Sequence, residues 1–159
     1  MVMFKWLWLS LLVFVLDQAS KLWVVDNFEL YESIQLFPSL NFTYVHNLGA
    51  AFSFLSSAGG WQRWFFVGFA LIATTILLVW LRKLKPTERW MAVTISLVLG
   101  GAIGNLYDRI SYGYVIDFID VYYKSHHWPV FNIADAAISI GVVMMLVDAF
   151  KGESSKAGQ

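Results

Sequence analysis

Residues 67–81 read VGFALIATTILLVWL and contain no charged side chain. With its flanking residues this apolar run covers 64–81, and a helix of about 20 residues crosses a hydrocarbon core of about 30 Å. Three other segments, at residues 4–25, 90–106 and 133–150, are long and apolar enough to do the same. The sequence therefore predicts a membrane protein with four transmembrane helices.

The composition of the whole chain agrees with this interpretation. Of its 159 residues, 58% are hydrophobic and 14% are charged, and the mean hydropathy is +0.61. A soluble domain is rarely so apolar. The length leaves room for one domain, so we interpret residues 1–159 as a single integral-membrane domain. The net charge is zero and gives no global field that would attract a nucleic acid, so none is expected as a partner.

The basic residues predict the orientation in the membrane. Seven of the eleven lie before the first span, between the second and third, or after the fourth: Lys5, Arg82, Lys83, Lys85, Arg89, Lys151 and Lys156. Cytoplasmic loops are enriched in Lys and Arg, so this side and both termini are expected to be cytoplasmic. Segments 26–63 and 107–132 are then extracytoplasmic.

The extracytoplasmic segments carry structure of their own. Residues 40–45 and 113–121 are rich in strand formers and predict a small β-sheet beside the helices. Residues 59–64, GGWQRW, predict an interfacial helix that leads into the second span. The polar residues 152–159 predict a disordered tail.

Ionisable residues gather in one stretch, residues 104–136, GNLYDRISYGYVIDFIDVYYKSHHWPVFNIADA. Charged groups beside a membrane core are expensive and by default mark a functional site. Asp117 follows an apolar run, and Asp135 stands where the fourth span begins. Asn132 could cap that helix with Asp135 in its first turn, which would be a purely structural role. That reading leaves Asp117 unexplained, so we interpret Asp117 and Asp135 as a functional carboxylate pair.

Two neighbouring carboxyl groups can hydrolyse a peptide bond without a metal or cofactor. They share one proton because both cannot easily ionise. The ionised member can act as general base on water, and the protonated member can donate to the carbonyl oxygen of the bond to be cleaved. The pair titrates as a unit, so the base is not assigned to either residue. Cysteine is absent, which excludes a thiolate nucleophile.

Two further charged pairs lie in the predicted spans. Asp17 and Lys21 are four residues apart and can meet on one helix face. A buried structural ion pair and a contact to substrate are equally compatible with this spacing. Asp108 and Arg109, at the end of the third span, are interpreted in the same way. The histidines show no metal-binding spacing and are interpreted as interfacial side chains: His46, His126 and His127.

Five blocks, in chain order, carry a family resemblance. They are residues 17–21 DQASK, 47–52 NLGAAF, 100–109 GGAIGNLYDR, 115–118 VIDF and 131–135 FNIAD. Together they closely resemble lipoprotein signal peptidase (signal peptidase II), a family of aspartic endopeptidases of the bacterial cytoplasmic (inner) membrane. The resemblance spans nearly the whole chain.

The resemblance implies a function and a set of site residues. Asp117 and Asp135 would be the catalytic pair. The residues that would bind substrate or support the pair are Asp17, Lys21, Asn47, Gly49, Ala51, Phe52, Gly104, Asn105, Asp108, Arg109, Phe118, Asn132 and Ala134. The implied substrate is a diacylglyceryl-modified prolipoprotein, cleaved before its lipidated cysteine at a site near the outer face, with its acyl chains in membrane lipid. The cyclic peptide globomycin is the implied inhibitor.

Two other functions remain open at this point. A small proton-coupled transporter could use Asp17, Asp108 and Asp135 as a relay, although most acids lie toward one end of the spans. A non-catalytic subunit of a membrane complex could use the polar outer loops as interaction surfaces.

Overall fold

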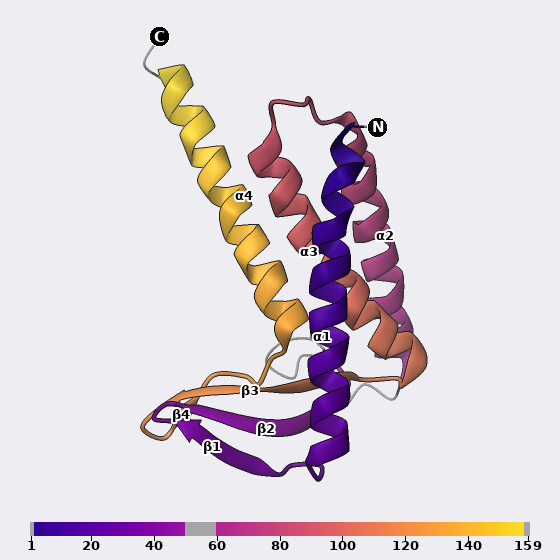
Figure 1. Ribbon diagram of the computed structural model, residues 1–159, viewed down its shortest axis with the longest axis vertical. Coiled ribbons are helices and arrows are strands. Elements are labelled where there is room, and N and C mark those ends of the chain that lie inside the picture. The colour runs from indigo at the N-terminus through magenta and orange to yellow at the C-terminus, as the bar shows by residue number, and fades with distance from the viewer. Residues whose placement is uncertain (1, 50–59, 158–159) are drawn as a thin grey trace.

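Four long helices form a bundle, and a β-sheet lies across one end of it (Figure 1). The computed structural model describes residues 2–49 and 60–157. A short 3₁₀-helix, η1 (Val2–Trp6), precedes the four α-helices: α1 (Leu7–Asn27), α2 (Trp61–Lys83), α3 (Arg89–Ser111) and α4 (Ile133–Ala157). All four are long and apolar enough to cross a membrane, which confirms the predicted spans.

Two helix ends differ from the sequence-based expectation. Trp61 and Trp64, expected in an interfacial helix that leads into the second span, belong to the first turn of α2, which begins after Gly60 at φ 97°. α4 continues past the predicted end of the span to Ala157, into the expected disordered tail. Adding residues to an existing helix needs no new nucleation, so both segments can extend a neighbouring span.

The sheet has four antiparallel strands in the order β1-β2-β3-β4. Their bounds are β1 (Ser33–Phe37), β2 (Leu40–Asn47), β3 (Val115–Tyr123) and β4 (His126–His127). β2 and β3 confirm the two predicted strands, whereas β1 and β4 were not expected. The register of β2 and β3 pairs Val45 with Asp117 and Asn47 with Val115, which brings the end of β2 to the polar residues of β3.

α3 is the central helix and packs against α1, α2 and α4. Two of its glycines permit this close approach. A Cβ at Gly100 would lie 2.7 Å from the backbone oxygen of Ser10 in α1. A Cβ at Gly101 would collide with the backbone oxygen of Ala134 in α4. Small residues let transmembrane helices approach closely, and here they bring α1 and α4 against the same helix.

Candidate active site

A buried lysine binds two carboxylates at the centre of the site. Lys21 Nζ lies 2.8 Å from Asp17 Oδ2 and 2.8 Å from Asp108 Oδ2, and all three side chains are at most 1% exposed. Gln18 Nε2 donates to the same two carboxylates, at 3.1 and 2.9 Å. The expected pairing of Asp17 with Lys21 is confirmed. Asp108 forms its ion pair with Lys21, whereas the neighbouring Arg109 donates to backbone oxygens.

The two carboxylates of the cluster also hold backbone groups of other elements. Asp17 Oδ1 accepts from the backbone N–H of Ala134 at the start of α4, at 2.9 Å. Asp108 Oδ2 accepts from the backbone N–H of Ile116 in β3, at 3.2 Å. A hydrogen bond to a charged group is stronger than a neutral one. The cluster therefore fixes the two segments that carry Asp135 and Asp117.

Gly104 makes room for this arrangement. A Cβ at that position would lie 2.5 Å from Asp17 Oδ2, which is far inside van der Waals contact. The expected importance of Gly104 therefore has a steric basis: only glycine leaves space for the Asp17 carboxylate against α3.

Two asparagines connect Asp117 with Asp135. Asn132 Nδ2 donates to Asp117 Oδ1 at 2.6 Å and to Asn105 Oδ1 at 3.1 Å. Asn105 Nδ2 donates to Asp135 Oδ1 at 2.7 Å, and Asn105 Oδ1 also accepts from Lys21 at 3.0 Å. The structure thus brings together the two carboxyl groups, 18 positions apart in the chain, in one hydrogen-bond network.

Asn132 also caps α4, as the sequence predicts. Its Oδ1 accepts from the backbone N–H of Asp135 at 2.9 Å, which is the usual bond of a helix N-cap. Asn132 is fully buried. One side chain therefore both caps α4 and donates a hydrogen bond to Asp117.

Asp117 lies in surroundings that favour its protonated form. It is 1% exposed, and burial raises its pKa from 3.8 to about 7, with a further contribution from the negative charge of Asp135. Hydrogen bonds from Asn47 and Asn132 and the charge of Lys21 oppose this rise. The folded protein holds a proton that the unfolded chain would release, so this group makes the free energy of unfolding fall as pH rises from 3.8 to about 7.

Asn47 and Arg109 form the other side of the site. Asn47 Nδ2 donates to Asp117 Oδ2 at 2.9 Å, and Asn47 Oδ1 accepts from the backbone N–H of Gly49 at 3.0 Å. Arg109 donates to the backbone oxygens of Gly49 and Asn105, at 3.0 and 3.2 Å, and its guanidinium lies over the ring of Phe66. Arg109 thus ties α3 to the chain that follows β2.

The remaining expected site residues have different positions. Phe118 packs in an apolar cluster with Val24, Tyr44 and Ile116. Ala134 contributes its backbone N–H to Asp17. Ala51 and Phe52 lie outside the described residues.

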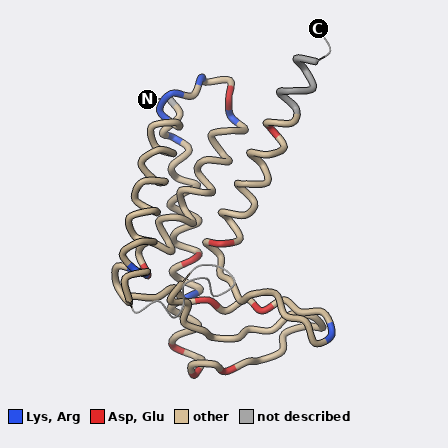
Figure 2. Tube along the Cα trace, turned by 180° about the vertical axis from the view of Figure 1, so that it is seen from behind, with Lys and Arg blue, Asp and Glu red and all other residues tan. Residues whose placement is uncertain are grey.

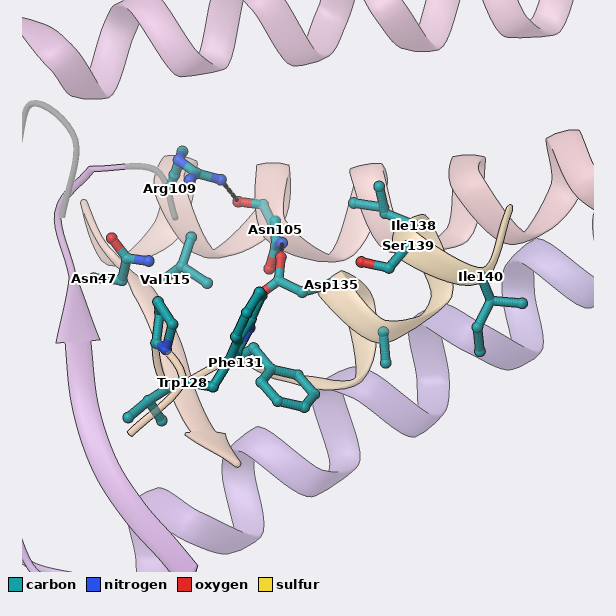
Figure 3. A pocket seen from close by; sticks show the side chains of 13 residues that line it. Asn47, Asn105, Arg109, Val115, Trp128, Phe131, Asp135, Ile138, Ser139 and Ile140 are labelled. Atoms are coloured by element: carbon teal, nitrogen blue, oxygen red, sulfur yellow. Dashed lines mark hydrogen bonds between the residues drawn. The ribbon is translucent and has the colours of Figure 1, made fainter. Parts of the chain in front are cut away.

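A cavity of about 670 Å³ opens beside Asp135, and Figure 3 shows the side chains that line it. Its size is in the range of sites for small molecules or peptide segments. The polar lining consists of Asn47, Asn105, Arg109, Asp135 and Ser139, and the apolar lining comprises Val115, Trp128, Pro129, Val130, Phe131, Ala136, Ile138 and Ile140. Polar groups that surround a carboxyl beside an apolar wall suit a peptide with hydrophobic side chains. Asp117 accepts a hydrogen bond from one of these lining residues, Asn47.

Several residues of the site were not assigned a role from the sequence. Gln18 stands inside the block 17–21, but nothing in the sequence shows that it reaches both Asp17 and Asp108. The wall 128–131 lies alongside β3, with Phe131 and Ile119 exchanging backbone hydrogen bonds of 2.8 and 3.0 Å. Among the described residues, no group of three His, Asp or Glu side chains gathers as metal ligands.

Comparison with known proteins agrees with these observations. A family profile described as signal peptidase (SPase) II, Peptidase_A8, matches residues 9–151. The lipoprotein signal peptidase of Pseudoalteromonas translucida is 59% identical over 95% of this chain and 91% of its own length. That of Alteromonas mediterranea is 52% identical over 96% of this chain and 84% of its own length.

Solved structures show the same fold. One bacterial membrane enzyme, determined by the in meso method at 2.3 Å resolution, has a TM-score of 0.87 and 32% identity. The match covers 96% of this chain and 91% of that one. A second such enzyme, at 1.9 Å resolution, has a TM-score of 0.79 at 32% identity, over 92% of this chain and 93% of that one.

Four apolar helices, a sheet across one end and a buried carboxylate site define a bacterial membrane enzyme. The chain belongs to the lipoprotein signal peptidase (signal peptidase II) family and is an aspartic peptidase with lipoprotein signal peptidase activity. The transporter alternative is thereby set aside. Its relay would also need Asp17 and Asp108 free, and both are bound to Lys21.

Proposed function

We propose that Asp117 and Asp135, called the dyad below, are the catalytic groups of this peptidase. The observation that carries the proposal is the chain of hydrogen bonds from Asp117 through Asn132 and Asn105 to Asp135. It holds two acidic side chains in one network beside a cavity. The raised pKa of Asp117 favours a pair that retains one proton near neutral pH.

The singly protonated dyad can complete the hydrolysis with water as the only reactant besides the substrate. The ionised carboxylate takes a proton from water while the water oxygen attacks the peptide carbonyl carbon, and the protonated carboxyl gives its proton to the carbonyl oxygen. In the second step the new carboxyl protonates the leaving nitrogen, and the other carboxylate takes a proton from the tetrahedral intermediate as the C–N bond breaks. The dyad ends with one proton, as it began.

The proposed substrate is a diacylglyceryl-modified prolipoprotein, cleaved immediately before its lipidated cysteine. The apolar wall of the cavity supports it, since residues such as Trp128, Phe131 and Ile140 can contact a hydrophobic signal peptide. Exposed apolar side chains on α2 and α4 face the surroundings of the bundle, where acyl chains can stay in membrane lipid. We expect a globomycin-type cyclic peptide to inhibit the enzyme by occupying this cavity.

Purified enzyme in detergent is expected to cleave the diacylglyceryl prolipoprotein at least about 100-fold faster, by kcat/KM, than the same chain with an unmodified cysteine. The reason is that binding of the lipid part helps to place the peptide bond between the carboxyl groups. Mass spectrometry of the products gives the cleavage position. Equal rates for both substrates, or cleavage elsewhere, would contradict the proposed specificity.

We further propose that the dyad faces the outside of the cytoplasmic membrane and that both termini are cytoplasmic. Figure 2 supports this orientation, because Lys and Arg gather at the end of the bundle opposite the sheet. η1 and the C-terminal end of α4 lie at the same end of the bundle (Figure 1).

Reporter fusions test this orientation. A fusion at Lys85, between α2 and α3, is expected to report a cytoplasmic location, and one at Lys124, between β3 and β4, an external location. The opposite pattern would overturn the orientation while leaving the dyad untouched.

A further inference from the structure

A stack of aromatic rings at the end of β2 lies next to the dyad but has no part in the mechanism above. The ring of His46 lies parallel to that of Tyr114, with centroids 3.6 Å apart and an angle of 17°. On another side, His46 Nε2 forms a 2.7 Å hydrogen bond with Tyr44 Oη. Tyr44 is 7% exposed and packs in the apolar cluster that includes Val24. The imidazole is therefore held by two tyrosines, one of them anchored in the protein core.

The stacked rings lie at the end of the β2–β3 ladder. His46 is paired with Ile116, and the final pair is Asn47 with Val115. Tyr114 precedes β3 directly, and its own ring stacks on Tyr112 at the end of α3, with centroids 6.1 Å apart. The rings thus connect the end of β2 to the α3–β3 junction at the point where backbone pairing ends.

The position of Asn47 depends on this end of β2. Its amide is the only side-chain group from β2 that bonds to Asp117 among the described residues. The bond is 2.9 Å long, so a shift of about 1 Å would break it. Displacements of that size in a catalytic site can reduce a rate by about 100-fold.

We propose that His46 is a positioning residue for the cleavage reaction: held between Tyr44 and Tyr114, it keeps the end of β2 in place so that the Asn47 amide stays bonded to Asp117. The proposal rests on the catalytic role proposed for Asp117. His46 acts through Asn47 and needs no contact with substrate.

The pH dependence of cleavage reports this role. The groups that act on Asp117 are the charges of Asp135 from α4, Lys21 from α1 and Arg109 from α3, together with two asparagine amides. The bond from Asn47 lowers the pKa of Asp117 by stabilising its ionised form. Loosening the Asn47 bond therefore raises the pKa of Asp117. The alkaline limb of the pH profile of kcat/KM then moves to higher pH. Burial lowers the pKa of His46 below its usual value.

The experiment measures kcat, KM and the pH profile of kcat/KM for His46→Ala and Asn47→Ala. His46→Ala is expected to lower kcat about tenfold with KM changed less than about twofold, because positioning acts on the transition state. Its alkaline limb should move in the same direction as that of Asn47→Ala. His126→Ala, which changes an exposed histidine of β4, is the matched control and should keep the wild-type profile.

His46→Phe keeps a flat ring on Tyr114 but loses the hydrogen bond to Tyr44. It should restore most of the activity lost in His46→Ala and serves as the test if the alanine variant does not fold. Tyr44→Phe removes the same bond from the other side, so the two effects, each about twofold to threefold, should not add in the double variant. Additive effects, or no effect of either substitution, would overturn the role of the bond.

The outcomes separate this proposal from the function on which it rests. A wild-type pH profile for His46→Ala, with a shifted profile for Asn47→Ala, would overturn the positioning role alone. Activity retained in Asp117→Asn, measured in the same series, would instead overturn the catalytic role of Asp117.

Discussion

Asp117→Asn and Asp135→Asn are each expected to lower kcat/KM for a diacylglyceryl prolipoprotein by at least about 1,000-fold. Asparagine has the shape of aspartate but cannot take a proton from water or share one with the second carboxyl. Its oxygen can still accept hydrogen bonds from Asn47 or Asn105, so the fold should persist. The measurement is cleavage by purified variants in detergent, with thermal unfolding as the check on folding.

Each of these variants has a matched control in the same element. Asp120→Asn changes another buried aspartate of β3, which is bonded to Asn41, Thr43 and His127 rather than to the dyad network. Asp148→Asn changes an exposed aspartate of α4. Both controls should cleave within about threefold of the wild type. More than a few per cent of wild-type activity in a folded variant of either dyad residue would contradict the proposed mechanism.

Lys21→Met is expected to lower the free energy of unfolding by about 3–5 kcal/mol, because it leaves Asp17 and Asp108 buried without their cation. The same change should abolish cleavage. The carboxylate of Asp17 holds the first turn of α4, and that of Asp108 holds β3, so both segments of the dyad lose their anchor. Unfolding in detergent and cleavage of the lipidated substrate measure the two effects.

The control for this variant is Lys85→Met, at an exposed lysine between α2 and α3. Its stability and cleavage rate should equal those of the wild type within experimental error. In the variant Asp17→Asn/Lys21→Met/Asp108→Asn the cluster has no charge. We expect this triple variant to recover part of the free energy of unfolding that Lys21→Met loses. A stable, active Lys21→Met would show that the cluster is not needed to position the dyad.

The four spans and one ion pair could be predicted from the sequence because each depends on residues close together in the chain. Span length follows from continuous apolar segments, and Asp17 and Lys21 are one helical turn apart. The cap of α4 by Asn132 is likewise a local feature. The dyad remains a prediction from the sequence, based on a carboxyl group at each end of the last extracytoplasmic segment.

Long-range contacts could not be predicted in this way. The partner of Asp108 is Lys21, in a different helix, and the choice depends on how α1 packs on α3. The cavity wall 128–131 has no periodic pattern, so nothing in the sequence marks it as a lining. His46 belongs to no metal-binding or catalytic sequence motif, and only the tertiary structure shows its contacts with the rings of Tyr44 and Tyr114.

The order of the elements has a consequence for biosynthesis. Asp117 is synthesised before Asp135, which lies in α4, after the other three long helices in chain order. Lys21, Asn105 and Asp108, which organise the centre, are already present by then. If Asp135 has the catalytic role proposed above, a chain that ends before α4 is expected to insert the first three helices but to lack peptidase activity.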